Sequence, residues 1–297
     1  MPELPDITIY VEAIRERVQG LPTERVRILT PFVLRSVEPS IRSIEGKRVV
    51  GVRRMGKRIV LEFETELFLV IHLMIAGRLL WKEGDLRLGR IGQAVLVFPH
   101  GSLVLTEAGS KKRASITLIQ GEENLNSIDP GGLDIFACAP EEFRSTLQHE
   151  NRTLKRALTH PQWFDGIGNA YSDEILHAAR LSPLKLTRAL SEEETLRLFR
   201  ACQSTLEDWI DRLRKQFKGK FPGQGQITAF RPEFAAHGKF GQPCPICGSK
   251  IQRIRYAENE TNYCANCQNE GRLLADRSLS RLLKSDWPKT LEEMEGD

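Results

Sequence analysis

Long hydrophobic runs are missing from the 297-residue chain, although apolar residues make up 40% of it. A bilayer-spanning helix needs about 20 consecutive apolar residues, so we expect a protein without membrane segments. The first 25 residues carry acidic side chains and lack an apolar core, which excludes a secretory signal peptide. By default this predicts a cytoplasmic protein.

A strong charge of either sign is also missing, and so is any internal repeat. The net charge is +4, a value that many soluble enzymes share and that excludes little by itself. Any single basic cluster could be ordinary solvated surface, but several of them in loops favour a polyanionic partner, most simply nucleic acid. The clusters lie at 53–58, 111–113, 212–220 and 253–255.

Cysteine is scarce, with six residues in the chain. Cys138 and Cys202 are isolated, and we interpret them as small buried hydrophobic residues. The other four have the spacing C-x2-C-x16-C-x2-C, in which two tight turns can complete a tetrahedron of thiolates around Zn²⁺. Disulfides are disfavoured in a cytoplasmic chain. Because four thiolates leave no position for water, we predict one structural Zn²⁺ per chain. Its ligands would be Cys244, Cys247, Cys264 and Cys267.

Hydrophobic periodicity divides the remaining chain into helical and strand-like parts. Apolar residues within 6–20 recur at helical spacing. From about 25 to 120 the spacing becomes strand-like, with short segments separated by turns, which suggests an antiparallel sandwich or barrel. Helical spacing returns after a linker at 128–136. There, Ser191 and Glu194 predict a capping box at the start of an amphipathic helix.

The expected fold class is therefore α+β with several domains. An N-terminal helix and an antiparallel β-sandwich would precede a helical domain, a Gly-, Pro- and Lys-rich loop at 218–243 and a four-cysteine zinc finger. We expect the domain limits to be 1–128 for the sandwich domain, 129–240 for the helical domain, 241–270 for the zinc-finger hairpin and 271–297 for a charged tail.

The sequence GIGN at 166–169 lies between two helical segments. Its glycines allow a tight backbone turn, and Asn169 with the N–H groups of the following helix could hold an anion, because a helix N-terminus favours negative charge. A plain turn before a capped helix is the more usual interpretation of such a short motif.

The chain begins MPELPD, which places a proline and a carboxylate at positions two and three. If the initiating methionine is removed, Pro2 becomes an N-terminal secondary amine. An α-amino pKa lies near 8, so a useful fraction of this amine is neutral at pH 7. Glu3 would stand directly beside it. The same residues could also be an accident of the start site.

The sequence resembles the formamidopyrimidine-DNA glycosylase / endonuclease VIII family of base-excision repair enzymes. The resemblance rests on MPELPD, GIGN, a lysine near 57 in a predicted hairpin and the four-cysteine hairpin. The resemblance covers residues 1 to about 268. It implies an N-terminal helix with a β-sandwich, a helix-two-turns-helix domain and a zinc finger. It also implies a monomer whose partner is double-stranded DNA with a damaged base or abasic site, and which is nucleoid-associated when bound.

The resemblance implies a bifunctional DNA glycosylase and AP lyase. Pro2 would attack C1′ of the damaged nucleotide and form an iminium that promotes β- and δ-elimination, with Glu3 as general acid/base at the sugar. Lys57 matches the family's catalytic-site lysine. His72 and Asn169 match residues that contact backbone phosphates, which sets the register but does not identify the base.

The chain departs from the family pattern at positions that contact DNA. Ile75 stands where a methionine fills the gap left by the flipped base, and Lys111, Lys112 and Arg113 occupy the loop expected to carry an Arg–Phe pair. Asn259 stands where the zinc finger usually has a phosphate-binding arginine. These changes leave an alternative open, a catalytically weakened relative that binds damaged or abasic DNA.

The loop at 218–243 does not visibly match the segment that covers an oxidised purine in the purine-specific branch. We therefore expect a lesion preference closer to endonuclease VIII, or to a divergent subgroup, than to a dedicated 8-oxoguanine enzyme. An RNA-binding or structural zinc protein outside repair is a third hypothesis, which the intact MPELP motif disfavours.

Overall fold

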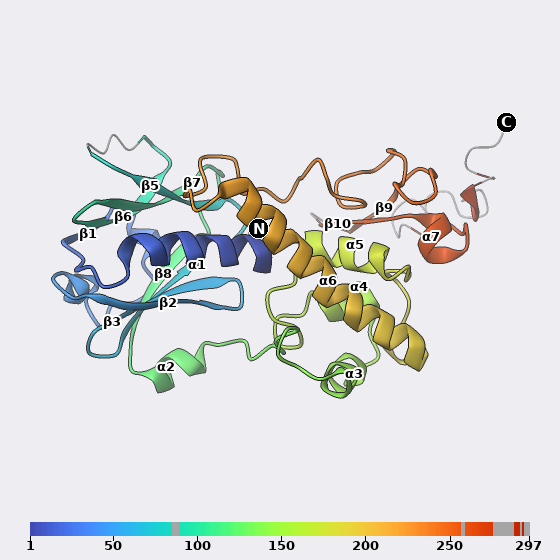
Figure 1. The fold of residues 1–297 in the computed structure, drawn as a ribbon, viewed down its shortest axis with the longest axis horizontal. Coiled ribbons are helices and arrows are strands. Elements are labelled where there is room, and N and C mark those ends of the chain that lie inside the picture. Colours follow the sequence, from blue (N-terminus) through green and yellow to red (C-terminus); the bar gives the residue numbers. More distant parts are fainter. Residues whose placement is uncertain (85–88, 257–258, 276–287, 292, 294–297) are drawn as a thin grey trace. The chain divides into compact units, whose positions relative to one another are not determined.

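The computed structural model describes the chain except residues 85–88, 257–258, 276–287, 292 and 294–297, and it leaves out the side chains of Tyr256 and Asn259. The chain divides into two compact units (Figure 1). Unit 1 comprises Met1–Pro130 and Trp209–Ala229, and unit 2 comprises Gly131–Asp208 and Phe230–Asp297. Within the described ranges, no helix has both the length and the apolar character that crossing a membrane requires.

Unit 1 contains two four-stranded antiparallel sheets. One has the order β1-β6-β7-β5 and the other β2-β3-β4-β8. The strands of the first sheet are β1 (Arg25–Ile28), β6 (Gly92–Phe98), β7 (Gly101–Glu107) and β5 (Gly77–Lys82). Those of the second are β2 (Val49–Met55), β3 (Arg58–Phe63), β4 (Leu67–His72) and β8 (Ser115–Gln120). The antiparallel sheets expected from the strand-like spacing are confirmed.

The hairpin predicted near Gly56 joins β2 to β3. Met55 pairs with Arg58, which leaves Gly56 and Lys57 as a two-residue turn. Gly56 has φ of 61°, in the left-handed region that such a turn requires and that glycine adopts without steric cost. The turn therefore places the Lys57 side chain at a defined end of the sheet.

Helix α1 (Leu4–Val18) lies beside the strands of unit 1 (Figure 1). Its apolar face packs into the core of that unit. Ile7, Tyr10 and Ile14 are fully buried there, at the helical spacing of the sequence. Leu213 and Phe217, from the end of a helix that begins in unit 2, complete the same core. Unit 1 also holds the short segments η1 (Pro31–Val33), η2 (Ile41–Ile44) and α2 (Glu122–Ser127).

The segment Trp209–Ala229 belongs to unit 1 because its side chains contact α1. Arg214 forms an ion pair with Glu12, with Nη2 and Oε1 2.7 Å apart. The ring of Phe221 lies 5.8 Å from that of Tyr10 between centroids. The residues after the helix are thus held against the first element of the chain.

Unit 2 is mainly helical and ends in the four-cysteine hairpin. Its elements are α3 (Pro140–Gln148), α4 (Leu154–Leu158), α5 (Asn169–Ala178), η3 (Thr187–Ala189), most of α6 (Glu192–Phe217), β9 (Gln252–Tyr256), β10 (Asn259–Tyr263) and α7 (Ala265–Asn269). The capping box before α6 is confirmed: Ser191 N–H donates to the Glu194 carboxylate at 2.9 Å, and Glu194 N–H donates to Ser191 Oγ at 3.1 Å. This pairing satisfies two donors at the helix start.

Residues 218–251, all of them described, contain no helix or strand, in agreement with the predicted loop. The α+β class with antiparallel sheets and a helical region is likewise confirmed. The domain limits expected from the sequence stay a prediction. Most of the charged tail expected at 271–297 lies outside the described residues.

Candidate functional site

The residues before α1 bury two carboxylates beside the start of the chain. Pro2 is buried, and Glu3 and Asp6 are only 3% and 2% exposed. Glu3 is the N-cap of α1, and its backbone N–H donates to Asp6 Oδ2 at 3.0 Å. Because this bond satisfies a donor that the helix itself leaves unpaired, it fixes the MPELPD backbone at the edge of the sandwich.

Four charged side chains act on the α-amino group at the start of the chain. Burial, the largest effect, lowers the pKa of the Met1 α-amino group below its ordinary value near 8. The negative charges of Glu3 and Asp6 oppose this shift, while the positive charges of Arg78 and Lys57 add to it. The neutral, nucleophilic form of an amine at this place is therefore favoured. The sequence predicted Lys57 here and missed Arg78.

His72 is the last residue of β4, and like the α-amino group it is influenced by the charge of Lys57. It pairs with Arg58 on β3 and with Ser115 on β8. Burial, with the charges of Arg58 and Lys57, lowers the pKa of His72 to about 4. The imidazole is therefore neutral at pH 7. A neutral imidazole can still donate one N–H to an anionic oxygen, so the predicted phosphate contact is chemically feasible.

Ile75 is the exposed tip of the loop between β4 and β5. Its side chain is 56% exposed, which is unusual for an aliphatic residue between two buried strands. Met74, the residue before it, has φ of 52°, so the backbone turns sharply at this point. The Ile75 carbonyl accepts a hydrogen bond from Arg78 Nη1 at 3.0 Å. The predicted gap-filling residue is thus presented outward on a braced loop.

The basic loop between β7 and β8 is organised by a buried acid that sequence reasoning missed. Glu107 is 1% exposed, and its carboxylate accepts the backbone N–H groups of Arg113 (2.9 and 3.0 Å) and Ala114 (3.2 and 3.3 Å). Lys112 Nζ donates to the Glu107 carbonyl. Lys111, Lys112 and Arg113 are exposed. The loop is therefore held by its backbone, which leaves cationic side chains on the surface.

The basic loop and the Ile75 loop touch each other. A Cβ added at Gly109 would lie 3.3 Å from the Ala76 side chain, and one at Gly77 would lie 3.0 Å from that of Ala114. Glycine at these positions permits the close approach. The loop with the exposed Ile75 and the loop with the three exposed cations are therefore neighbours in unit 1.

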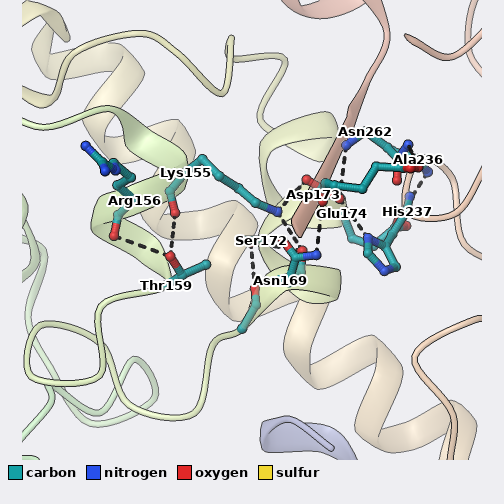
Figure 2. Close-up of polar contacts among 12 residues, drawn as sticks. Lys155, Arg156, Thr159, Asn169, Ser172, Asp173, Glu174, Ala236, His237 and Asn262 are labelled. Atoms are coloured by element: carbon teal, nitrogen blue, oxygen red, sulfur yellow. Dashed lines mark hydrogen bonds and ion pairs between the residues drawn. The ribbon is translucent and has the colours of Figure 1, made fainter. Parts of the chain in front are cut away.

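In unit 2, Asn169 is the first residue of α5, after a turn in which Gly166 has φ of 76° (Figure 2). Lys155 Nζ donates to the Asn169 carbonyl at 2.6 Å. The Asn169 side-chain amide donates to the carbonyl of Glu260 in β10 at 3.0 Å. The predicted anion-binding residue therefore lies where the N-terminus of α5 meets the finger hairpin.

Asp173 is the hub of a buried polar network (Figure 2). It is 1% exposed, and its carboxylate lies 2.5 Å from Lys155 Nζ and 2.7 Å from His237 Nδ1. It also accepts the backbone N–H of Asn262 at 3.2 Å. These bonds join α4, the loop before the finger and β10 to one carboxylate on α5.

Glu174, the neighbour of Asp173, orders the loop before the finger. Its carboxylate accepts the N–H groups of three successive residues, Ala235, Ala236 and His237, at 2.8 to 2.9 Å (Figure 2). Burial raises the pKa of Glu174, and the three hydrogen bonds work against that shift. Neither carboxylate was recognised from the sequence, because their partners lie 18 to 89 residues away along the chain.

The four cysteines of the finger converge as the spacing predicted. Their sulfur atoms all lie within 4.8 Å of one another. Cys244 Sγ is 3.9 Å from Cys267 Sγ, and Cys247 Sγ is 3.4 Å from Cys264 Sγ. Zn–S bonds of about 2.3 Å separate the sulfurs of a tetrahedron by roughly 3.8 Å, so the cluster fits a zinc ion.

Asn259 and two nearby arginines are the candidate phosphate contacts of the finger hairpin. The backbone of Asn259 pairs with Tyr256, but the Asn259 side chain lies outside the described residues. Arg253 and Arg255 both form ion pairs with Glu260, at 3.5 and 3.4 Å. A phosphate would therefore have to compete with this carboxylate for either guanidinium.

Three family profiles match the chain in succession. The formamidopyrimidine-DNA glycosylase N-terminal domain matches residues 1–112, the formamidopyrimidine-DNA glycosylase H2TH domain matches 134–218, and the zinc finger found in FPG and IleRS matches 241–269. These are the modules that the sequence motifs indicated, in the same order.

Individual relatives span nearly the whole chain. The formamidopyrimidine-DNA glycosylases of Heliobacterium modesticaldum and Desulforamulus reducens are 29% and 28% identical to this chain. Each alignment covers 90% of this chain, together with 100% of the first relative and 99% of the second. The structure of the Lactococcus lactis Fpg in complex with DNA containing an abasic site has a TM-score of 0.79, with 24% identity over 90% of this chain and 99% of that one. The chain belongs to the formamidopyrimidine-DNA glycosylase / endonuclease VIII family.

Proposed function

We propose that this protein is a base-excision repair enzyme that removes damaged bases from double-stranded DNA and then cuts the strand at the resulting abasic site. The observation that carries the proposal is the start of the chain. There, Glu3 and Asp6 are buried, and burial lowers the pKa of the Met1 α-amino group, with the charges of Arg78 and Lys57 adding to that shift. Removal of Met1 would place the Pro2 amine in the same surroundings. Relatives that match over nearly the full length are named as DNA glycosylases.

The reaction would begin at the nitrogen of Pro2, once Met1 has been removed. As the amine bonds to C1′, the bond from C1′ to the base breaks and the departing base takes up a proton. Opening of the C1′–O4′ bond then gives an iminium, and O4′ takes the proton that the nitrogen gives up. Because proline is a secondary amine, this iminium has no N–H to lose and keeps its positive charge.

The iminium acts as an electron sink for strand cleavage. It acidifies C2′, so loss of a C2′ proton to a base expels the 3′ phosphate by β-elimination. A second, δ-elimination expels the 5′ phosphate, and water then releases the sugar fragment from the enzyme. Glu3 is the carboxylate nearest to the nitrogen in sequence, and we assign it the proton transfers at the sugar. Lys57 would contact phosphate beside the reacting nucleotide.

Binding of duplex DNA would use the cationic and amide groups of both units. Lys111, Lys112 and Arg113 are exposed on a loop with a defined backbone, and His72 and Asn169 offer further donors to phosphate oxygens. Ile75 would fill the space that the extruded nucleotide leaves, as apolar side chains do in enzymes that flip bases. The solved relatives include complexes with DNA that contains 8-oxoguanine or an abasic site.

One zinc ion per chain would hold the finger. Cys244, Cys247, Cys264 and Cys267 would bind it as thiolates, and with four protein ligands the metal would be structural. Asn259 stays a candidate DNA contact of this hairpin. Lesion preference, opposite-base preference and the monomeric state stay predictions from the sequence.

The test is borohydride trapping on a duplex with a single abasic site. We expect the unaltered protein to form a covalent adduct with DNA after reduction of the iminium, and to leave a one-nucleotide gap when borohydride is omitted. Pro2→Gly keeps an amine but loses the secondary nitrogen, so we expect a large fall in trapped product. Glu3→Gln should bind the same duplex while base excision falls by two or more orders of magnitude.

A matched control is Glu16→Gln, an exposed carboxylate on the same helix, which should behave like the unaltered protein. Tight binding of the abasic duplex without any adduct would refute the enzyme and support the weakened DNA-binding relative. Failure to prefer damaged or abasic duplex over undamaged duplex would refute both hypotheses.

A further inference from the structure

Arg78 is the second residue of β5 and is half-buried in unit 1. It lies opposite Thr106 on β7, and Thr106 Oγ1 donates to the Arg78 carbonyl at 3.2 Å. The next residue, Leu79, donates its N–H to the hydroxyl of the buried Tyr10 at 3.4 Å. The backbone at Arg78 is thus fixed from both sides, so its side chain leaves the sheet at a defined place.

The guanidinium of Arg78 joins two segments that are far apart in the sequence. Its Nε donates to the carbonyl of Ile227 at 2.7 Å, and its Nη1 donates to the carbonyls of Ile75 (3.0 Å) and Gly77 (2.7 Å). Ile227 is itself 1% exposed and is part of the core of unit 1. The exposed Ile75 loop is therefore tied, through one side chain, to a buried anchor in the segment that follows α6.

The same guanidinium acts on the start of the chain. The charges that act on the Met1 α-amino group are those of Glu3 before α1, Asp6 in its first turn, Lys57 of the β2–β3 turn and Arg78 of β5. By direct contact, Arg78 joins two parts of the candidate site: the gap-filling loop and the segment around Ile227.

We propose that Arg78 is a positioning residue that holds the Ile75 loop in the conformation needed for base extrusion. The proposal rests on the function proposed above. Only a planar guanidinium can donate from Nε and Nη1 to carbonyls of two separate segments, so lysine should keep the charge but lose the bracing. Methionine should lose both.

The test compares Arg78→Lys and Arg78→Met with Arg27→Met, an exposed arginine of β1 in the same sheet. Single-turnover excision is measured on duplexes with 8-oxoguanine or dihydrothymine, whichever the unaltered protein excises faster. Strand cutting is measured on a preformed abasic duplex. The ratio of the two rates is compared because a loss of folded protein lowers both rates equally.

We expect Arg78→Lys and Arg78→Met to lower the excision-to-cutting ratio by about tenfold or more, because a preformed abasic site has no base to extrude. Arg27→Met should leave this ratio unchanged.

A ratio within twofold of the unaltered protein in both Arg78 variants would overturn the bracing role. Absence of trapping in the unaltered protein would instead refute the proposed function, so the two failures are distinguishable.

Discussion

The buried Lys155–Asp173 pair offers the sharpest prediction about what holds unit 2 together. Asp173 is 1% exposed and Lys155 8% exposed, and their charged atoms lie 2.5 Å apart. Asp173→Asn keeps the shape of the side chain but removes its charge. The Lys155 ammonium would then remain buried, with the Asn169 carbonyl as a partner but without its counter-ion.

Removing one partner of a buried ion pair costs about 3–5 kcal/mol, because the remaining charge is desolvated without compensation. We expect this loss of unfolding free energy in Asp173→Asn, and a smaller loss in Lys155→Met, because Asp173 then keeps His237 and the Asn262 N–H as partners. The double variant Lys155→Met/Asp173→Asn leaves no buried unpaired charge. Its cost should therefore be smaller than the sum of the two single changes by about 2 kcal/mol or more.

Urea unfolding followed by both circular dichroism and tryptophan fluorescence provides the assay, because coincident curves establish whether one free energy describes the transition. Lys185→Met, which breaks the more exposed Lys185–Glu194 pair, is the matched control and should cost about 1 kcal/mol or less. A loss below about 1 kcal/mol in Asp173→Asn, or strict additivity in the double variant, would refute the reasoning.

Three further predictions concern pH, the basic loop and the metal. The pKa of His72 is about 4 in the folded protein against 6.5 ordinarily, so the unfolded chain binds more protons between these values. Stability should then be fully present above pH 6.5 and fall as the pH drops toward 4, by up to about 3 kcal/mol, and His72→Gln should flatten that dependence in urea unfolding measured at each pH. Glu107→Gln should leave the N–H groups of Arg113 and Ala114 poorly satisfied and lower the Tm. When Lys111 and Arg113 are unchanged, the same substitution should also weaken duplex binding several-fold. The loss of affinity should disappear in a Lys111→Ala/Arg113→Ala background, and its persistence there would contradict a role through the cations. Denaturation should release one zinc ion per chain, measured with a chromogenic chelator, and Cys264→Ala should abolish tight metal binding; undiminished binding in that variant would contradict the four-cysteine site.

Features that depend on neighbouring residues were predictable from the sequence. The hairpin at Gly56, the helix after Pro5 and the capping box at Ser191 each follow from side chains within a few residues of one another, and each is present. The cysteine cluster followed from spacing, because each C-x-x-C pair is local and the loop between the pairs is short.

Features that depend on contacts over long sequence separations were not predictable. Glu107 ends a strand like any polar residue, and only the fold reveals that its carboxylate is buried against backbone N–H groups. Nothing in the residues around Arg78 indicates that it binds a carbonyl 149 residues away. Asp173 and Glu174 follow the GIGN motif, and no local pattern indicates that their carboxylates are buried.

The charge clusters also required the fold for their interpretation. Arg53 forms ion pairs with Glu62 and Glu122, and Arg214 with Glu12, so these cations are partly neutralised. Lys111 and Arg113, in contrast, have exposed side chains for which the described part of the structure contains no ion pair. A cluster of basic residues in the sequence therefore does not reveal whether their side chains form ion pairs or are available to bind phosphate.

The most direct measurement is the identity of the atom that borohydride joins to an abasic sugar. The trapped complex of the unaltered protein would be digested with nuclease and trypsin and its peptides sequenced by mass spectrometry. We predict a sugar-derived mass on the nitrogen of Pro2, in chains that have lost Met1. A mass on Lys57, or an adduct on chains that retain Met1, would contradict the proposed chemistry.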